Sequence, residues 1–261
     1  MSDESAPAAP AVLTERRGSV LLITLNRPEV RNAVNAALAE GLAGALEQLD
    51  GDDSLSVGVL TGAGGFFSAG MDLGAFVRGE SAWFGDRGFA GITQRSARKP
   101  LIAAIEGFAL AGGLEIALAC DLLVAAQGAR MGIPEVKRSL VAAGGALLRM
   151  PRRMPYHVVM ELALTGDPQP AERFHELGLV NRLSEPGAAV EVALELADSL
   201  AKNAPLALVA TKRVLQDQFD WTSEEMWDRQ AAITGPVFVS EDAKEGSSAF
   251  KEKREPVWKG R

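Results

Sequence analysis

Short apolar runs alternate with amphipathic segments in the first half of the chain. Four runs, at residues 19–25, 56–60, 101–105 and 121–126, are short, apolar and bounded by turn residues, which favours buried strands. Over residues 33–49, apolar side chains recur every three or four positions, a spacing that predicts a helix. Strands separated by helices favour parallel pairing, so this half is expected to form an α/β layer.

The second half is dominated by helical patterns. A strand-like stretch at residues 178–183 is the exception, and helices are expected at residues 156–164, 170–177, 187–202, 205–219, 223–233 and 241–253. We therefore expect a loose tail over residues 1–10, a core over residues 11–200 and a helical C-terminal region over residues 201–261.

Composition excludes several classes of site. The 261 residues carry 27 Lys and Arg against 34 Asp and Glu, a net charge of −7, which argues against sequence-independent nucleic-acid binding. One cysteine excludes an internal disulfide framework, and two histidines exclude a three-histidine metal centre, so no metal site is expected. Carboxylates and backbone groups are the remaining candidates for chemistry.

No targeting or membrane segment is evident in the sequence. The first ten residues contain acids where an export signal needs bases, and acidic residues interrupt the most apolar region at Glu106, Glu115 and Asp121. A cytoplasmic protein without a membrane partner is the expectation.

The segment AGGLEIALACD, at residues 111–121, combines a glycine-rich helix start with an acid. The free N–H groups of a helix start carry partial positive charge, and Glu115 follows Gly112 by about one turn. The rest of the helix is apolar on nearly every side, which indicates burial. A buried carboxylate is costly unless it is paired or used, so Glu115 is a candidate for catalysis; the alternative is a Glu satisfied by a neighbouring Arg or amide.

A second acid, Glu135, lies in the segment MGIPEV. An acid beside Pro134 suits the first turn of a helix, which is the structural explanation. Two carboxylates near one oxyanion site can instead hold a water and perform acid–base chemistry, which makes Glu135 the candidate partner of Glu115.

Glycines also mark a loop after the second strand. The stretch TGAGG fits neither a dinucleotide fingerprint nor a phosphate loop and predicts a tight turn. The following FFSAGMDL, residues 66–73, has small residues that let a ligand approach backbone N–H groups closely; the alternative is a plain connecting loop.

Together these segments resemble the crotonase superfamily of enoyl-CoA hydratases and isomerases, from about Val20 to the C-terminus. The resemblance rests on LITLNRPEVRNAVN, TGAGGFFSAGMDL, KPLIAAIEGFALAGGLEIALACD, MGIPEV and the terminal FVSEDAKEGSSAFKEKR. It implies a crotonase-like spiral core of ββα units followed by a helical trimerisation region. It also implies acyl-CoA substrates, a homotrimer or a dimer of trimers, and no resident cofactor.

By resemblance, the site residues follow. The backbone N–H groups of Ala69 and Gly112 would bind the thioester oxygen, and Glu115 and Glu135, at the family's interval of 20 positions, would act as base and acid in hydration. Matching positions for CoA binding are Arg27, Arg31, Ser68, Ala69, Gly70, Met71, Asp72, Leu73, Phe250 and Lys253.

The chain departs from the family pattern around the second acid. Residues 142–149 read AAGGALLR, without the Thr-Gln pair that many hydratases carry, and Ile133 stands where a polar amide is frequent. The expected activity is enoyl-CoA hydration. The alternatives are a double-bond isomerase, a dehydratase of a functionalised acyl-CoA, and a non-catalytic acyl-CoA-binding protein.

Overall fold

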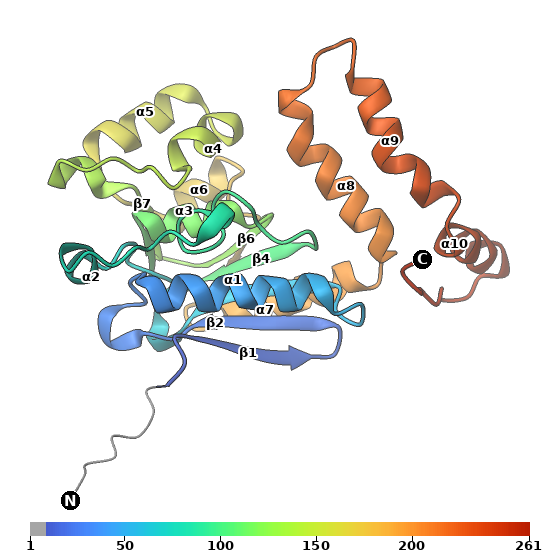
Figure 1. The fold of residues 1–261 in the computed structure, drawn as a ribbon, viewed down its shortest axis with the longest axis horizontal. Coiled ribbons are helices and arrows are strands. Elements are labelled where there is room, and N and C mark those ends of the chain that lie inside the picture. Colours follow the sequence, from blue (N-terminus) through green and yellow to red (C-terminus); the bar gives the residue numbers. More distant parts are fainter. Residues whose placement is uncertain (1–8) are drawn as a thin grey trace, which may run out of the picture.

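A six-stranded sheet forms the centre of the protein, for which a computed structural model describes residues 9–261 (Figure 1). Its strands lie in the order β1 (Val12–Arg17), β2 (Val20–Leu25), β3 (Val57–Gly62), β4 (Leu101–Ile105), β6 (Leu122–Ala126) and β9 (Arg182–Ser184). β1 pairs antiparallel with β2, and every other neighbouring pair in this sheet is parallel. The expected α/β layer is confirmed.

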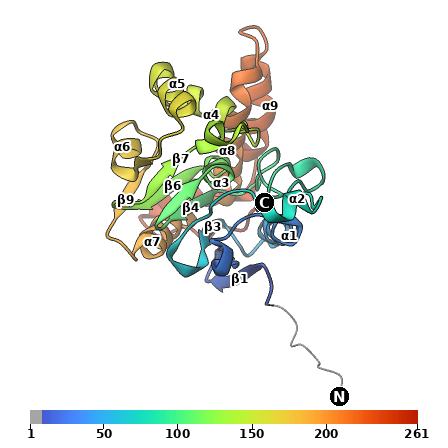
Figure 2. The same ribbon diagram turned by 90° about the vertical axis from the view of Figure 1, so that its left-hand side faces the viewer.

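Both faces of this sheet are covered by helices because its strands are apolar on both sides. Leu21 and Ile23 of β2 join a core with the first helix, α1 (Ala36–Gly51), whereas Val20 and Leu22 face α7 (Ala189–Ala201). Alanines at four-residue spacing, Ala189, Ala193 and Ala197, form the buried face of α7 and let that helix approach the sheet closely (Figure 2).

The remaining helices continue the fold. They are α2 (Leu73–Val77), α3 (Gly112–Ala119), α4 (Ala146–Arg153), α5 (Tyr156–Thr165), α6 (Ala171–Glu176), α8 (Pro205–Asp217), α9 (Met226–Phe238) and α10 (Glu241–Glu252). Short 3₁₀ helices are η1 (Pro28–Val30), η2 (Ala63–Gly65), η3 (Gly85–Arg87), η4 (Pro134–Arg138) and η5 (Gln218–Asp220).

A second, three-stranded sheet was not expected from the sequence. It pairs β5 (Phe108–Leu110) with β7 (Arg130–Gly132), and β7 with β8 (Gln169–Pro170). These strands have two or three residues each, too few to show a period of two. β1 was also not predicted. Five of its six residues are exposed at the sheet edge and the sixth, Val12, is only partly buried, so the strand shows no apolar pattern.

The C-terminal helices α8 to α10 extend from one side of the sheet (Figure 1). Lys212 of α8 ties them to the core: its ammonium lies 2.6 Å from the Asp121 carboxylate and donates to the Lys99 carbonyl at 2.9 Å. The boundary expected near residue 200 stays a prediction, and the tail expected over residues 1–10 lies largely outside the described residues.

Candidate active site

Glu115 lies on α3, whose eight residues are all buried. Only 4% of Glu115 is exposed, and the amide of Ala146, at the start of α4, donates to its Oε1 at 3.1 Å. Gly144 lies against the same carboxylate, since a β-carbon added at Gly144 would come within 2.5 Å of Oε2. The start of α4 therefore holds the acid of α3.

Burial raises the pKa of Glu115, because an ionised carboxylate loses its hydration in an apolar surrounding. The amides of Ala146, Gly144 and Gly145 and the positive charge of Arg149 act in the opposite direction. A desolvated carboxylate that is still held by donors suits a base, since it is poised to take a proton.

Glu135 lies in the first turn of η4, directly after Pro134. Its Oε2 is buried and has no hydrogen-bond partner within residues 9–261. Burial, together with a smaller effect of the negative charge of Glu115, raises the pKa of Glu135 to about 7. The two acids thus interact electrostatically, and Glu115 has donors from the start of α4 whereas Oε2 of Glu135 has none within residues 9–261, an arrangement that separates their proton affinities.

The backbone amides near α3 require a correction to the sequence-based prediction. Ala69 cannot supply a free amide, because its N–H donates to the Arg31 carbonyl at 3.0 Å. In the described part of the chain, neither Met71 nor Gly112 has an acceptor for its N–H. Met71, rather than Ala69, is therefore the candidate partner of Gly112 in an oxyanion hole.

Gly70 and Gly112 bring these two amides to the same place. Gly70 has a φ of +89°, and a β-carbon there would lie 2.7 Å from the amide nitrogen of Gly112. A β-carbon at Gly112 would in turn meet the Phe89 ring at 2.5 Å. Only glycines allow this close approach of the two backbone segments.

Ala111, just before α3, has an unusual backbone conformation, with φ 52° and ψ −128°. This region is strained for a residue with a β-carbon. The amide of Ala111 donates to the Gly132 carbonyl at 2.9 Å, so the second sheet fixes the turn that points the Gly112 amide outward from the helix start.

Three residues expected to bind CoA have contacts within the protein. Asp72 begins α2 by accepting from the Ala75 amide at 3.0 Å, and it pairs with Arg27 at 3.1 Å. The Ser68 hydroxyl donates to the Asn32 carbonyl at 2.8 Å and accepts from the Gly70 amide at 3.1 Å. These side chains shape the loop that presents Met71.

The other expected CoA residues fall into two groups. Arg31 and Leu73 are exposed beside this loop. Phe250, which is 87% exposed, and Lys253 lie at the end of α10, far from α3 within one chain (Figure 1). The structure therefore does not bring these two together with the carboxyl groups inside a single chain.

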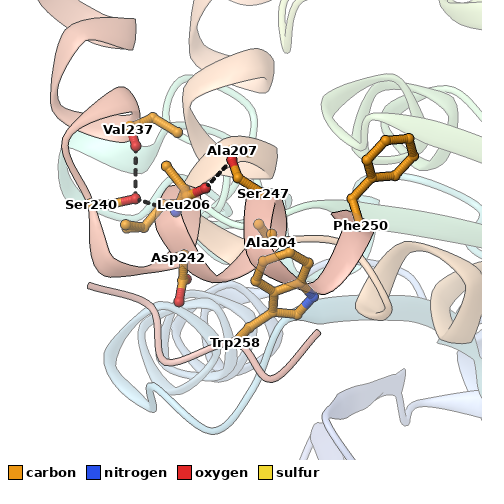
Figure 3. A pocket seen from close by; sticks show the side chains of 11 residues that line it. Ala204, Leu206, Ala207, Val237, Ser240, Asp242, Ser247, Phe250 and Trp258 are labelled. Carbon is orange, nitrogen blue, oxygen red and sulfur yellow. Dashed lines mark hydrogen bonds between the residues drawn. The ribbon is translucent and has the colours of Figure 1, made fainter. Parts of the chain in front are cut away.

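A cavity of about 390 Å³ lies next to Phe250 and apart from the two acids (Figure 3). It is lined by α8, the end of α9, α10 and the segment that follows α10, with Trp258 packed against Gly246. Asp242 holds this segment by accepting from the amides of Lys259 and Gly260 at 2.7 and 2.9 Å. The cavity contains no residue of α3 or η4.

Sequence reasoning missed two contributors to the site. The first is the backbone amide of Met71, whose position depends on the turn at Gly70. The second is the start of α4, where Gly144 and Ala146 contact the Glu115 carboxylate from at least 29 positions further along the chain. The paired glycines before α4 were the available signal. Residues 9–261 contain no cluster of three metal-ligating side chains, and none of their helices combines the length and apolar character that a bilayer crossing requires.

Comparisons with known proteins identify the family of this chain. The model of the family described as enoyl-CoA hydratase/isomerase matches residues 15–261. The enoyl-CoA hydratase EchA19 of Mycobacterium tuberculosis is 40% identical, with 97% of this chain and 98% of that protein covered. A carnitinyl-CoA dehydratase of Salmonella typhimurium is 41% identical, with 94% and 97% covered.

Solved structures show the same fold. A crystal structure of an enoyl-CoA hydratase from Mycobacterium tuberculosis superposes with a TM-score of 0.95 at 58% identity, covering 97% of this chain and all of the other. A carnitinyl-CoA hydratase from Mycobacterium avium gives a TM-score of 0.78 at 43% identity, with the same coverage.

Proposed function

Because this chain belongs to the enoyl-CoA hydratase/isomerase family, we propose that it is a hydro-lyase that adds water reversibly across the 2,3 double bond of an enoyl-CoA thioester. The observation that carries the proposal is the buried Glu115 and the partly buried Glu135 beside two amides that have no acceptor within residues 9–261. Glu115 is held by a donor, and Glu135 has a buried oxygen with no hydrogen-bond partner among the same residues.

In the hydration direction, the water oxygen bonds to Cβ while a water proton passes to Glu115. The electrons of the double bond move onto the thioester oxygen and form an enolate, which the amides of Met71 and Gly112 bind. The enolate then collapses as Cα takes the proton of Glu135. One water is added in total, and proton exchange between the carboxyl groups and solvent restores the starting state.

Each contribution has an expected size. An oxyanion donor acts mainly in the transition state, where the oxygen charge is greatest, and losing one costs about 100- to 1,000-fold in rate. A positioned acid or base contributes about 100- to 10,000-fold.

CoA enters this proposal as part of the substrate, with no resident cofactor. Arg31 and Leu73 lie beside the Met71 loop and would approach the CoA portion. Phe250 and Lys253 would contact CoA bound to a neighbouring subunit, in a homotrimer or a dimer of trimers in the cytoplasm. Light scattering of the purified protein tests that assembly.

A dehydratase of a functionalised acyl-CoA is the second candidate. It is favoured by the relatives named carnitinyl-CoA dehydratase and carnitinyl-CoA hydratase. The same two acids would perform it in reverse: Glu135 would take the Cα proton, and Glu115 would protonate the departing hydroxyl.

A substrate panel tests the proposed function. The purified protein is incubated with crotonyl-CoA, longer 2-enoyl-CoAs, 3-enoyl-CoAs and a γ-trimethylammonium crotonyl-CoA, and products are identified by mass. A mass increase of one water on a 2-enoyl-CoA supports hydration, and a shifted double bond without added water supports an isomerase. Tight binding of all substrates without turnover contradicts an enzyme.

A further inference from the structure

Arg149 of α4 lies next to the site but has no role in the steps above. Its side chain donates to two backbone carbonyls, that of Gly144 at 3.4 Å and that of Thr93. Gly144 also touches the Glu115 carboxylate, and Thr93 belongs to the loop that carries Phe89 against Gly112. Arg149 thus joins the segment that holds Glu115 to the segment that packs on the oxyanion amides.

The guanidinium is also a charge without a direct counterion. It is half-buried, and within residues 9–261 no carboxylate lies at ion-pair distance from it. Burial and the nearby charge of Arg153 lower the pKa of Arg149, and the negative charge of Glu115 opposes this. An arginine stays protonated in such surroundings, so its positive field acts on whichever acid lies nearby.

That field reaches the two acids unequally. Arg149 lowers the pKa of Glu115, against the larger effect of burial. The influences on Glu135 are its own burial, its own backbone amide and the charge of Glu115, with no cation among them. One acid therefore has a positive neighbour and the other has only a negative one.

We propose that Arg149 is a positioning residue that keeps Glu115 ionised as the base and so leaves Glu135 as the proton donor. This inference rests on the proposed function, because only a two-acid reaction needs such a division. Removing the charge would raise the proton affinity of Glu115, so that the two carboxyl groups would compete for one proton.

The other charged and titratable groups around the pair do not supply this asymmetry. Cys120 of α3 is buried, and burial raises the pKa of its thiol, so it stays neutral. Arg153 donates to the Leu118 carbonyl at 2.8 Å, near the far end of α3 from Gly112. Glu115, Glu135 and Arg149 remain as the charged groups that determine the proton distribution.

The test compares Arg149→Gln with Arg149→Lys, using Arg152→Gln as a matched control. Arg152 is an exposed arginine of the same helix, with an ion pair to Asp220 at 3.6 Å. For each protein, kcat/KM for enoyl-CoA hydration is measured across pH. The rising acid limb, where Glu115 loses its proton, is expected to move up by about one pH unit or more in Arg149→Gln, since an opposite charge nearby shifts a carboxyl by about 1–3 units.

Arg149→Lys keeps the positive charge and is expected to retain the acid limb of the wild type, even if weaker contacts with the Gly144 and Thr93 carbonyls lower kcat. Arg152→Gln is expected to match the wild type. An Arg149→Gln limb that coincides with the wild type would overturn the proposal, since a merely structural arginine lowers the rate without moving the limb. If Arg149→Gln does not fold, Arg149→Lys decides alone. Because lysine keeps the positive charge, an acid limb of Arg149→Lys that lies at higher pH than that of the wild type would overturn the proposal.

A second readout separates this inference from the proposed function. Carbon-13 NMR of glutamate-labelled protein, with Glu115→Gln used to assign the signal, follows the Glu115 carboxyl directly. Its pKa should rise in Arg149→Gln even if the wild type hydrates no enoyl-CoA, which would refute only the proposed function. An unchanged Glu115 titration would refute the role of Arg149.

Discussion

Gly144 and Glu115 are in direct contact, so that a β-carbon at Gly144 would lie 2.5 Å from Oε2 and 2.9 Å from Cδ of the carboxyl group. The contact joins the segment before α4 to the buried helix α3. It leaves the Glu115 carboxylate no room to move toward Gly144, while the Ala146 amide holds its Oε1. The orientation of the Glu115 carboxylate is therefore set by its contact with Gly144, a residue without a side chain.

Gly144→Ala should consequently lower kcat/KM for hydration by about 100-fold, because displacing a catalytic group by about 1 Å costs on that order. The matched control is Gly44→Ala, at an exposed position of α1 where no neighbouring atom of residues 9–261 lies within 4 Å of the added carbon. Steady-state kinetics and circular dichroism compare the two. Equal activity of both variants would show that Glu115 need not be held in this position.

Ala111→Gly is expected to stabilise the protein. The conformation at φ 52° and ψ −128° strains an alanine by about 1–3 kcal/mol, whereas the glycine costs about 0.4–1 kcal/mol through the unfolded chain. The balance is about 1 kcal/mol, or a rise in Tm of about 2–4 °C. Ala37→Gly, at an exposed site of α1, should lower Tm instead; a fall in both variants would argue against strain at Ala111.

Glu135 makes stability depend on pH. Its pKa is raised from 4.5 to about 7, so the folded protein binds this proton more tightly than the unfolded chain does. The stability that this tighter proton binding gives the folded protein is therefore fully present below about pH 4.5 and is lost as pH rises through about 7. Glu135→Gln should raise Tm at pH 8 by about 2–4 °C, allowing for screening of a partly exposed group, and should match the wild type near pH 4.5. Calorimetry at both pH values decides; a pH-independent difference would contradict the raised pKa.

The same pKa predicts the alkaline limb of the reaction. Glu135 must carry a proton to donate it to Cα, so kcat/KM for hydration should fall as pH rises above about 7. Dehydration starts from the same singly protonated pair, with the proton on Glu115 and Glu135 ionised, and the reaction takes up no net proton, so kcat/KM for dehydration must fall in parallel over the same interval. The profile is measured with an enoyl-CoA, and a kcat/KM for hydration that stays level as pH rises well above 7 would contradict this assignment.

The sequence predicted those parts that depend on local pattern. The strand at Leu101–Ile105 has the expected bounds, and the buried α3 with its acid follows from an apolar run after two glycines. Glu135 lies in a first helical turn after proline, as its local sequence indicated. These features need only neighbouring residues.

The parts that could not be predicted depend on contacts distant in sequence. The assignment of Ala69 as an oxyanion donor failed because its amide is used by Arg31, 38 positions earlier. Along the loop, Ala69 and Met71 look equivalent, and only the turn at Gly70 and the bond to Arg31 distinguish them. The expected helix over 33–49 likewise begins at Ala36, because the Asn35 side chain caps it by accepting from the Leu38 amide.

The central claim is that two acids of different proton affinity act together on an enoyl thioester. It is tested most directly by the crotonyl-CoA hydration rates of the wild type, Glu115→Gln and Glu135→Gln at neutral pH, with circular dichroism to verify folding. We predict that each folded variant loses about 100-fold or more of kcat. Full activity in both variants would contradict the two-acid mechanism.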